Sequence, residues 1–325
     1  MSNKKITMSK RPIEFPDESN FNLINEGTLE LKDGEVRLQT LWLSLDPYMR
    51  GRMRILDIGE TMIGEVVAKV TESKSKHFSE GSIVLSKSGW QSEPIVNGET
   101  LVLVDSRIKP HNLAIGPIGM PGLTAYFGLM KIGLPKPGET VVVSAGSGAV
   151  GSVVGQIAKY AGCKVIGIAG SEHKVRYMLD DLNFDAGINY KDSDWEENLT
   201  KSCPDGVDIY FDNVGGVISD KVINEINEFA RVIICGQISQ YNNSNIELGP
   251  RNHMQFLTKR AKLEGFMVYT YQDQYLEGVN FLLQMNTEGL LKYRETVVEG
   301  IENAPSAFLK LFRGENFGKL LIKVS

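Results

Sequence analysis

The sequence contains few of the residues that cross-link a chain through sulfur or metal. Among its 325 residues are 3 cysteines and 4 histidines. Cys163, Cys203 and Cys235 are odd in number and widely separated, which argues against a disulfide framework and is typical of a reducing compartment. No C-x-x-C or H-E-x-x-H motif occurs. We therefore expect no bound metal. The remaining alternative is a metal site assembled from residues that lie far apart in the sequence.

Long apolar runs are also absent. No run approaches the roughly 20 residues that a membrane helix needs. The amino-terminal segment "MSNKKITMSKRPIEF" is basic but has no apolar core, so it is not typical of a secretory signal. The net charge of −5 gives no reason to expect nucleic acid or an anionic membrane as a partner. We expect a cytoplasmic protein that acts on a small molecule.

The pattern of strands and helices predicts two domains of different kinds. Residues 1–118 contain short stretches such as "EVRLQTLWLSL" (35–45) separated by turns, which predicts a β barrel or sandwich. From residue 119 strands and helices alternate, with "KVINEINEF" (221–229) as one expected helix, which predicts a parallel sheet covered on both faces. We expect an α/β protein with a β-rich domain of 1–118 completed by 292–325, and a nucleotide-binding domain of 119–291.

A glycine-rich turn carries the strongest local motif. Gly146, Gly148 and Gly151 form G-x-G-x-x-G directly after an expected strand and at the start of an expected helix. In a dinucleotide site the first glycine permits the tight turn, the second lets the backbone approach a pyrophosphate, and the third allows close helix–strand packing. The helix amino terminus then offers N–H groups to the phosphates. The alternative is a purely structural turn of small residues.

The end of the next strand lacks the acidic residue that usually binds the ribose of NAD. "KVIGIAG" ends on Gly170, followed by Ser171 and then Lys174. Glycine leaves room for a 2′-phosphate, serine can donate to it, and lysine supplies positive charge, so the sequence favours NADP(H). Glu172 is expected to face solvent. The alternative for Lys174 is a solvated position in the first turn of the following helix.

Several stretches resemble the zinc-free medium-chain dehydrogenases/reductases, in particular the prostaglandin reductase and leukotriene 12-hydroxydehydrogenase group, also described as alkenal/one oxidoreductases. The similarity extends from about residue 35 to the carboxyl terminus. The segments that carry it are "LSLDPYMRGRM" (43–53), "GMPGLTAYFGL" (119–129), "GAVGSVVGQIAKYAGCKVIGIAGSEHKV" (148–175), "INYK" (188–191), "FDNVGG" (211–216), "CGQISQYN" (235–242) and "GENFGKLLIKV" (314–324).

The resemblance implies a GroES-like catalytic domain, a Rossmann domain, NADPH bound in the cleft between them, and no zinc. It implies that Gly148, Ala149, Val150 and Gly151 contact the pyrophosphate. Lys174 and Tyr190 are implied at the phosphate end of the adenosine. The residues implied along the rest of the cofactor are Asn213, Cys235, Gly236, Gln237, Ile238, Ser239, Tyr241, Phe266, Met267, Val268 and Asn316. Simple packing is the alternative for Tyr190, Phe266 and Val268, and a turn position for Asn316.

The resemblance also implies reduction of the carbon–carbon double bond of α,β-unsaturated ketones and aldehydes. Hydride transfer to the β-carbon places negative charge on the carbonyl oxygen, and a hydrogen-bond donor aimed at that oxygen lowers the barrier. Tyr48 and Tyr241 are the candidate phenols, with the cofactor's ribose hydroxyl as an alternative. Several family members carry a tyrosine where this chain has Thr258, whose hydroxyl is a third candidate.

Other functions stay open from sequence. These are NADP-dependent oxidation of a secondary alcohol of the leukotriene 12-hydroxyl type, quinone reduction, and cofactor binding without turnover. The "LSLDPYMRGRM" stretch argues against the quinone reductases. Rossmann domains of this family usually pair through edge strands, so a homodimer is expected, with "KLEGFMVY" (262–269) as the candidate edge.

Overall fold

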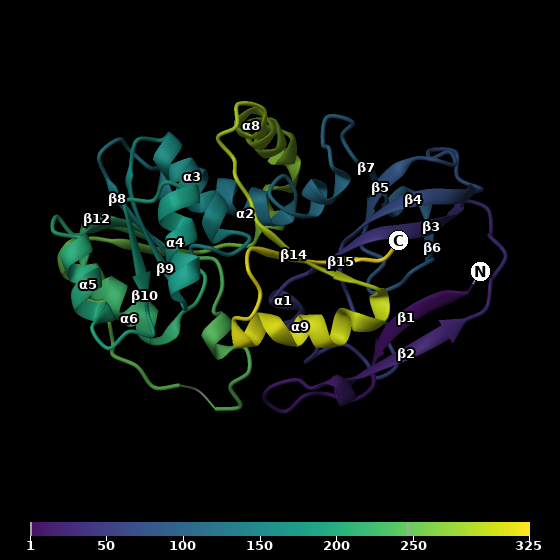
Figure 1. Ribbon diagram of the computed structural model, residues 1–325, viewed down its shortest axis with the longest axis horizontal. Coiled ribbons are helices and arrows are strands. Elements are labelled where there is room, and N and C mark those ends of the chain that lie inside the picture. Colours follow the sequence, from purple (N-terminus) through teal and green to yellow (C-terminus); the bar gives the residue numbers. More distant parts are fainter. Residues whose placement is uncertain (1, 246) are drawn as a thin grey trace. The chain divides into compact units, whose positions relative to one another are not determined.

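A computed structural model describes residues 2–245 and 247–325 of the chain (Figure 1). It divides into two compact units, which are described separately below. The first comprises the residues up to Gly116 together with Glu295–Ser325, and the second comprises Pro117–Arg294. No helix within the described residues has both the length and the apolar character needed to cross a membrane.

The second unit is built on a six-stranded sheet in which every neighbouring pair is parallel (Figure 1). The strand order is β10-β9-β8-β11-β12-β13, which is the 3-2-1-4-5-6 order of a Rossmann fold. The chain reverses direction across the sheet between β8 and β11, and ligands of such sheets bind beyond the carboxyl ends of the strands at this point. The strands are β8 (Thr140–Ser144), β9 (Lys164–Ala169), β10 (Ala186–Asn189), β11 (Val207–Asp212), β12 (Ile226–Ile234) and β13 (Lys262–Gly265).

Helices cover both faces of this sheet because its central strands β8, β9 and β11 are buried on both sides. Val142 and Tyr210 belong to one buried cluster with Leu199 of α5 (Trp195–Ser202) and Val222 of α6 (Gly216–Asn224). On β9, Gly167 lies against the ring of Phe184, which also lies against Gly155 of α3 (Gly151–Tyr160). Because neighbouring residues of a strand face opposite ways, α3 lies on the other face. The other α-helices of this unit are α2 (Met120–Phe127), α4 (Glu172–Arg176), α7 (His253–Lys259) and α8 (Tyr275–Thr287).

The first unit is β-rich. Its main sheet has the order β14-β15-β3-β4-β5-β7, with β6 paired to β3, and β1 and β2 form a separate antiparallel hairpin. The carboxyl-terminal β15 lies antiparallel to β3 and parallel to β14. The strands are β1 (Asn3–Met8), β2 (Phe21–Glu26), β3 (Glu35–Leu45), β4 (Val66–Ser73), β5 (Ile83–Ser86), β6 (Ile95–Asn97), β7 (Val102–Leu103), β14 (Glu295–Glu299) and β15 (Lys319–Lys323).

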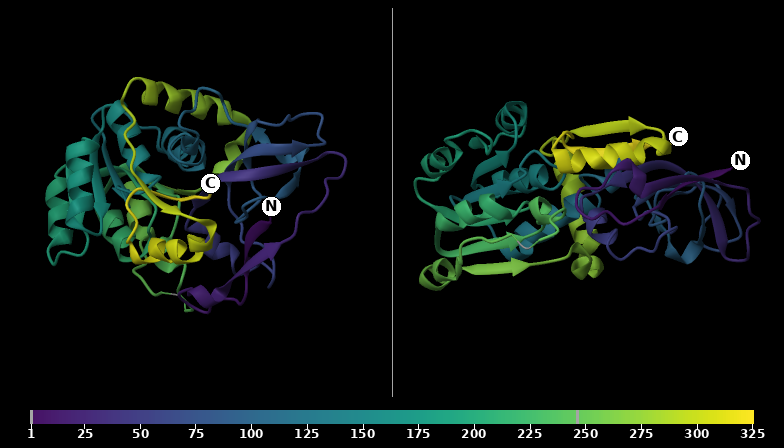
Figure 2. Two further views of the ribbon diagram at one scale, coloured as in Figure 1. Left: turned by 45° about the vertical axis from the view of Figure 1, so that its right-hand side comes forward. Right: turned by 90° about the horizontal axis from the view of Figure 1, so that it is seen from below.

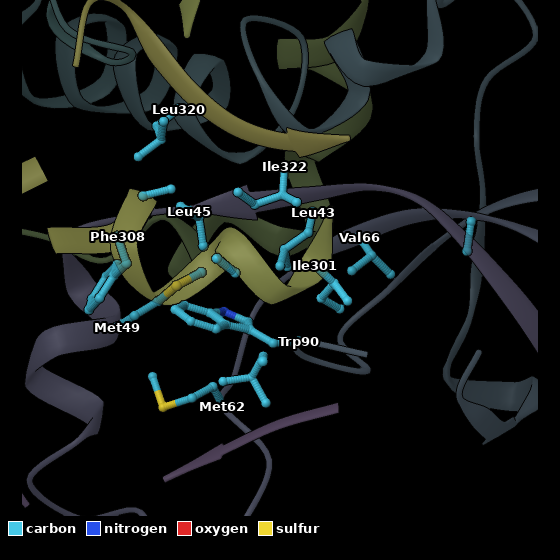
Figure 3. Close-up of a cluster of buried hydrophobic side chains, with 14 of the residues drawn as sticks. Leu43, Leu45, Met49, Met62, Val66, Trp90, Ile301, Phe308, Leu320 and Ile322 are labelled. Carbon is cyan, nitrogen blue, oxygen red and sulfur yellow. The ribbon is translucent and has the colours of Figure 1, made fainter. Parts of the chain in front are cut away.

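One apolar cluster forms the core of the first unit (Figure 3). Trp90 is fully buried, and its ring centroid lies 5.6 Å from that of Phe21 and 5.5 Å from that of Phe308. Phe308 lies on α9 (Ala304–Arg313), whose buried residues recur at helical spacing. Both views of Figure 2 show this yellow helix beside the yellow strands of the carboxyl terminus. The tail therefore completes the core of the first unit.

The α/β class is confirmed, with a β-rich unit and a doubly wound Rossmann unit. One expected element is wrong: α6 ends at Asn224, and Ile226–Phe229 begin β12. Pairing with β11 overrides the helix-like spacing there, and the ladder contains an irregularity between Val207 and Ile209. The last parallel strand is also shorter than expected, since β13 ends at Gly265.

Candidate nucleotide-binding and catalytic site

The glycine turn between β8 and α3 packs its backbone closely. A Cβ atom added to Gly151 would lie 2.3 Å from the carbonyl oxygen of Ala145 and 3.0 Å from the Cα of Gly146. A Cβ added to Gly148 would lie 3.1 Å from the same oxygen. The third glycine is therefore required by packing, whereas the contact at the second glycine is less close.

The start of α3 offers unpaired amides. No side chain caps the helix at Val150, and the N–H of Ser152 donates to the carbonyl of Gly148 at 3.0 Å. Within residues 2–245 and 247–325, no protein acceptor satisfies the N–H groups of Val150 and Gly151. These groups carry the partial positive charge of the helix amino terminus, so this turn is suited to bind a pyrophosphate.

Three of the expected residues, Gly170, Ser171 and Tyr190, lie at the carboxyl end of β9. The ring of Tyr190 lies against Gly170, and the Tyr190 N–H donates to the carbonyl of Ala169 at 3.0 Å. The Ser171 hydroxyl is buried and has no hydrogen-bond partner among the described residues. An unpartnered buried hydroxyl is costly unless a ligand satisfies it. This hydroxyl fits the phosphate ester of NADP. The space beside Gly170 is filled by the Tyr190 ring, so the glycine makes room for that ring and not, as expected, for the phosphate itself.

Two lysines supply positive charge at this position. The half-buried Lys174 lies on α4. Its pKa is lowered, first by desolvation and to a smaller extent by the positive charge of Lys191. Glu172 accepts a hydrogen bond from Arg176 at 3.2 Å, and both side chains are mostly exposed. The acidic residue therefore faces solvent, as expected. Lys191 follows Tyr190 directly and was not anticipated, because a single lysine after a strand has no distinguishing pattern.

Asp212 joins the end of β8 to the loops that follow β11 and β12 at the carboxyl edge of the sheet. It is fully buried at the end of β11. Its Oδ1 accepts hydrogen bonds from the hydroxyls of Ser144 (3.1 Å) and Tyr210 (2.8 Å) and from the N–H groups of Val214 and Gly215 (2.9 Å each), while its Oδ2 accepts from Gln237 Nε2 at 3.1 Å. These donors compensate the buried charge. Asp212 was not among the residues expected from the sequence, although it precedes the expected site residue Asn213.

The loops after β11 and β12 contain several more expected residues. Asn213 donates through Nδ2 to the carbonyl of Ser144 at 2.8 Å. The Gln237 N–H donates to the Tyr241 hydroxyl at 3.3 Å, and burial raises the pKa of that phenol. Burial also raises the pKa of the Cys235 thiol to about 12, so it stays protonated at neutral pH. The remaining expected residues of these loops are Gly236, which follows β12, and Ile238 and Ser239, which begin a 3₁₀ turn.

Phe266, Met267 and Val268 follow β13. The Phe266 ring lies edge-on to Phe211 at 6.4 Å between centroids. Met267 is exposed, and Val268 begins a 3₁₀ segment. These three residues therefore lie in the connection after the edge strand, at the same carboxyl end of the sheet as the other loops.

Tyr48 lies in the first unit, at the first position of α1 (Tyr48–Arg52). Its side chain is 42% exposed. Desolvation raises the pKa of the phenol, and the negative charges of Asp46 and Glu65 raise it further. The phenol is therefore neutral at physiological pH and can donate a hydrogen bond. It begins a short helix, whereas the sequence analysis expected a loop.

Two expected residues are engaged with backbone groups. The Thr258 hydroxyl on α7 donates to the carbonyl of Met254 at 2.8 Å. Its proton is thus engaged within the helix in the free protein. Asn316 lies in the first unit, where its Nδ2 donates to the carbonyl of Gly318 at 3.0 Å.

Within the described part of the chain, no group of three or more histidine, cysteine, aspartate or glutamate residues could hold a metal ion.

Comparison with known proteins gives matches along nearly the whole chain. A family model described as the N-terminal domain of oxidoreductase matches residues 4–104, and one described as zinc-binding dehydrogenase matches residues 149–284. The putative NADP-dependent oxidoreductase YfmJ of Bacillus subtilis is 46% identical over 100% of this chain and 98% of its own length. Prostaglandin reductase 1 of Bos taurus is 46% identical over 98% of both chains.

A solved structure is similar along the full length. The crystal structure of CurA from Vibrio vulnificus in complex with NADPH is 42% identical, covers 99% of each chain and has a TM-score of 0.95. NADPH-dependent curcumin reductase of Escherichia coli is 40% identical over 99% of this chain and 97% of its own length. The similarity spans both units.

Proposed function

Because the chain belongs to the medium-chain dehydrogenase/reductase family, we propose that it is an NADPH-dependent reductase of the carbon–carbon double bond of α,β-unsaturated ketones and aldehydes. Relatives at 39–46% identity have the names prostaglandin reductase, curcumin reductase and 2-alkenal reductase. Curcumin and 2-alkenals share a double bond conjugated to a carbonyl group. That shared group is the proposed substrate class.

The observation that carries the cofactor assignment is the environment after β9. Gly170 lets the Tyr190 ring lie against the backbone, the buried Ser171 hydroxyl lacks a partner among the described residues, and Lys174 lies within the electrostatic reach of Lys191. An anionic ester satisfies the hydroxyl and offsets the repulsion between the two ammonium groups. The turn at Gly148–Gly151 would hold the pyrophosphate, and the loops at Asn213, Cys235–Tyr241 and Phe266–Val268 the rest of the cofactor. We propose Asn316 as a further residue that contacts the cofactor.

The proposed chemistry divides between cofactor and protein. When bound, NADPH supplies the hydride. The protein's own part is to orient the enone and to donate a hydrogen bond to its carbonyl oxygen, where negative charge develops. Tyr48 is our first choice of donor, because its phenol is partly exposed and stays protonated at neutral pH. Tyr241 is the second choice, and its hydroxyl already accepts from the backbone at 3.3 Å.

NADPH consumption with a panel of substrates tests this function. The panel contains short 2-alkenals, a long-chain enone, a 15-keto prostaglandin and the matched saturated carbonyl compounds. We expect oxidation of NADPH with the unsaturated members only, and much weaker activity with NADH. Equal rates with saturated and unsaturated members, or activity only as an alcohol dehydrogenase with NADP⁺, would contradict the proposal.

Three further expectations belong to the same proposal. The unit of residues up to 116 with 295–325 is the catalytic domain, and 117–294 is the NADP-binding domain. We propose a homodimer through β13, whose four residues are all exposed and whose outer edge pairs with no strand among the described residues. A cytoplasmic location is supported by the three free cysteines.

A further inference from the structure

A buried ion pair lies at the base of the helix that carries Tyr48. Lys319 Nζ lies 2.7 Å from Asp46 Oδ1 and donates to the carbonyl of Leu45 at 2.8 Å. The two charged side chains are only 3% and 9% exposed. The Ser44 hydroxyl donates to the second carboxylate oxygen of Asp46. Each charge is thus compensated by the other and by hydrogen bonds, as burial requires.

The position of this pair follows from the sheet. β15 lies antiparallel to β3, with Leu320 opposite Leu45. This register places Lys319, the first residue of β15, opposite Asp46, the residue that follows β3. Lys319 therefore joins the carboxyl-terminal strand to the point where the chain leaves β3 to form α1.

The backbone of Asp46 also accepts a hydrogen bond from the first turn of the helix. Its carbonyl accepts the N–H of Met49 at 3.1 Å, and the carbonyl of Pro47 accepts the N–H of Arg50 at 3.0 Å. No side chain caps the amino terminus of this helix. The backbone of Asp46 therefore fixes the direction in which α1 leaves the sheet, and so fixes the position of Tyr48, the first residue of α1. The carboxylate of Asp46 is in turn bound to Lys319.

We propose that Lys319 is a positioning residue for the reaction: its buried ion pair with Asp46 sets the location of the Tyr48 phenol and compensates the negative charge next to it. The proposal rests on the function given above and on Tyr48 as donor. Lys319 itself touches no reacting atom. Its second effect is electrostatic, because the Asp46 carboxylate raises the pKa of the Tyr48 phenol beyond the increase that desolvation causes. The Lys319 ammonium offsets that carboxylate within the ion pair.

The test is a double-mutant cycle on the rate of hydride transfer in a single turnover with a 2-alkenal. The four proteins are wild type, Lys319→Met, Tyr48→Phe and the double variant. We expect Lys319→Met to slow the step by roughly 10- to 100-fold, as a small misplacement of a catalytic group does. In the Tyr48→Phe background the same change should have no further effect. Losses that multiply, or a Tyr48→Phe enzyme with the wild-type rate, would overturn the proposal.

Two more variants separate positioning from folding. Lys319→Arg keeps the charge and should retain most of the rate. Asp46→Asn/Lys319→Met removes both charges, so we expect recovery of thermal stability without recovery of the hydride-transfer rate. Recovery of both would show that the ion pair is only structural. This variant also carries the test if Lys319→Met alone does not fold.

Hydrogen exchange gives a readout that does not depend on turnover. Amides of residues 48–53 should exchange faster in Asp46→Asn/Lys319→Met than in wild type, whereas those of β8 and β9 in the other unit should not change. Unchanged exchange at 48–53 would contradict the proposed positioning. Wild-type protein that reduces no enone would instead contradict the proposed function, so the two failures are distinguishable.

Discussion

The ring of Tyr190 occupies the space that a side chain at position 170 would need. A Cβ atom added to Gly170 would lie 2.8 Å from Cε1 of the ring and 2.9 Å from its hydroxyl oxygen. Gly170→Ala should therefore displace the ring from the phosphate site. Because Tyr190 is 39% exposed and can move outward, we expect little loss of thermal stability and a roughly 10-fold weaker affinity for NADPH, worth about 1.4 kcal/mol.

The measurement is a titration of NADPH fluorescence. Gly27→Ala is the matched control, because a Cβ there meets no atom within 4 Å and the residue lies in the other unit. The control should bind NADPH as wild type does. Equal affinity of the two variants would contradict the role given to the contact between Gly170 and Tyr190.

The two lysines should act on the phosphate and on little else. Lys174→Met and Lys191→Met should each weaken NADPH binding by roughly 10- to 100-fold, since a charge-assisted hydrogen bond contributes about 1.5–3 kcal/mol. NADH binding should change less than twofold. Lys201→Met is the control, because Lys201 forms an exposed pair with Glu197 at 2.7 Å on α5. An equal loss for NADH and NADPH would show that the lysines do not recognise the phosphate.

Lys174 also predicts a pH dependence of cofactor affinity. Its pKa in the free protein lies below that of an ordinary lysine because of desolvation and Lys191. The protonated form binds the phosphate, so its contribution is fully present below this pKa and is lost as the pH rises through it. The NADPH dissociation constant of wild type should rise at a lower pH than that of Lys191→Met. Coincident curves for the two proteins would contradict the coupling between the lysines.

The second and third glycines of the turn should fail in different ways. Gly151→Ala brings a Cβ within 2.3 Å of a backbone oxygen that cannot move without its strand. We expect a loss of about 1–3 kcal/mol in the free energy of unfolding, as for other overpacked sites. Gly148→Ala brings a contact of 3.1 Å and should keep the fold but weaken NADPH binding. Urea unfolding and fluorescence titration separate the two effects, and equal stability of both variants would contradict this account.

Glu65 should make stability depend on pH. Desolvation and the charge of Asp46 raise the pKa of its carboxyl to about 7, against the opposing charges of Lys87 and Lys319. The folded state thus binds this proton more tightly than the unfolded chain, whose glutamate pKa is about 4.3. The stabilisation is present below about pH 4.3 and is lost as the pH rises to about 7. In urea unfolding, Glu65→Gln should become more stable relative to wild type as the pH rises from 5 to 8. A difference in the free energy of unfolding between the two proteins that stays constant over this range would contradict the raised pKa of Glu65.

The positions of the glycine turn and of the end of the next strand could be predicted because the information for them is local. Gly148 and Gly151 have fixed spacing between a strand and a helix, and Gly170, Ser171 and Lys174 lie within five residues at the end of the next strand. Adjacent parallel strands bring such turns to one edge of the sheet. The structure has them there, in the turn after β8 and at the end of β9.

The support of Tyr48 could not be predicted, because its partners are distant in sequence. Lys319 and Asp46 are 273 positions apart, and only the pairing of β15 with β3 brings them together. The start of β12 was missed for a related reason. Val222, Ile223 and Ile226 repeat at helical spacing, and only the ladder to β11 shows that Ile226 belongs to a strand.

The most direct test of the reaction is the fate of the transferred hydrogen. NADPH carrying deuterium at both C4 positions is mixed with the protein and 2-nonenal, and the product is analysed by NMR and mass spectrometry. The account predicts nonanal with one deuterium at C3, the β-carbon. Deuterium at C1 of 2-nonenol would show carbonyl reduction, and unlabelled product or no product would equally contradict the proposed transfer to carbon.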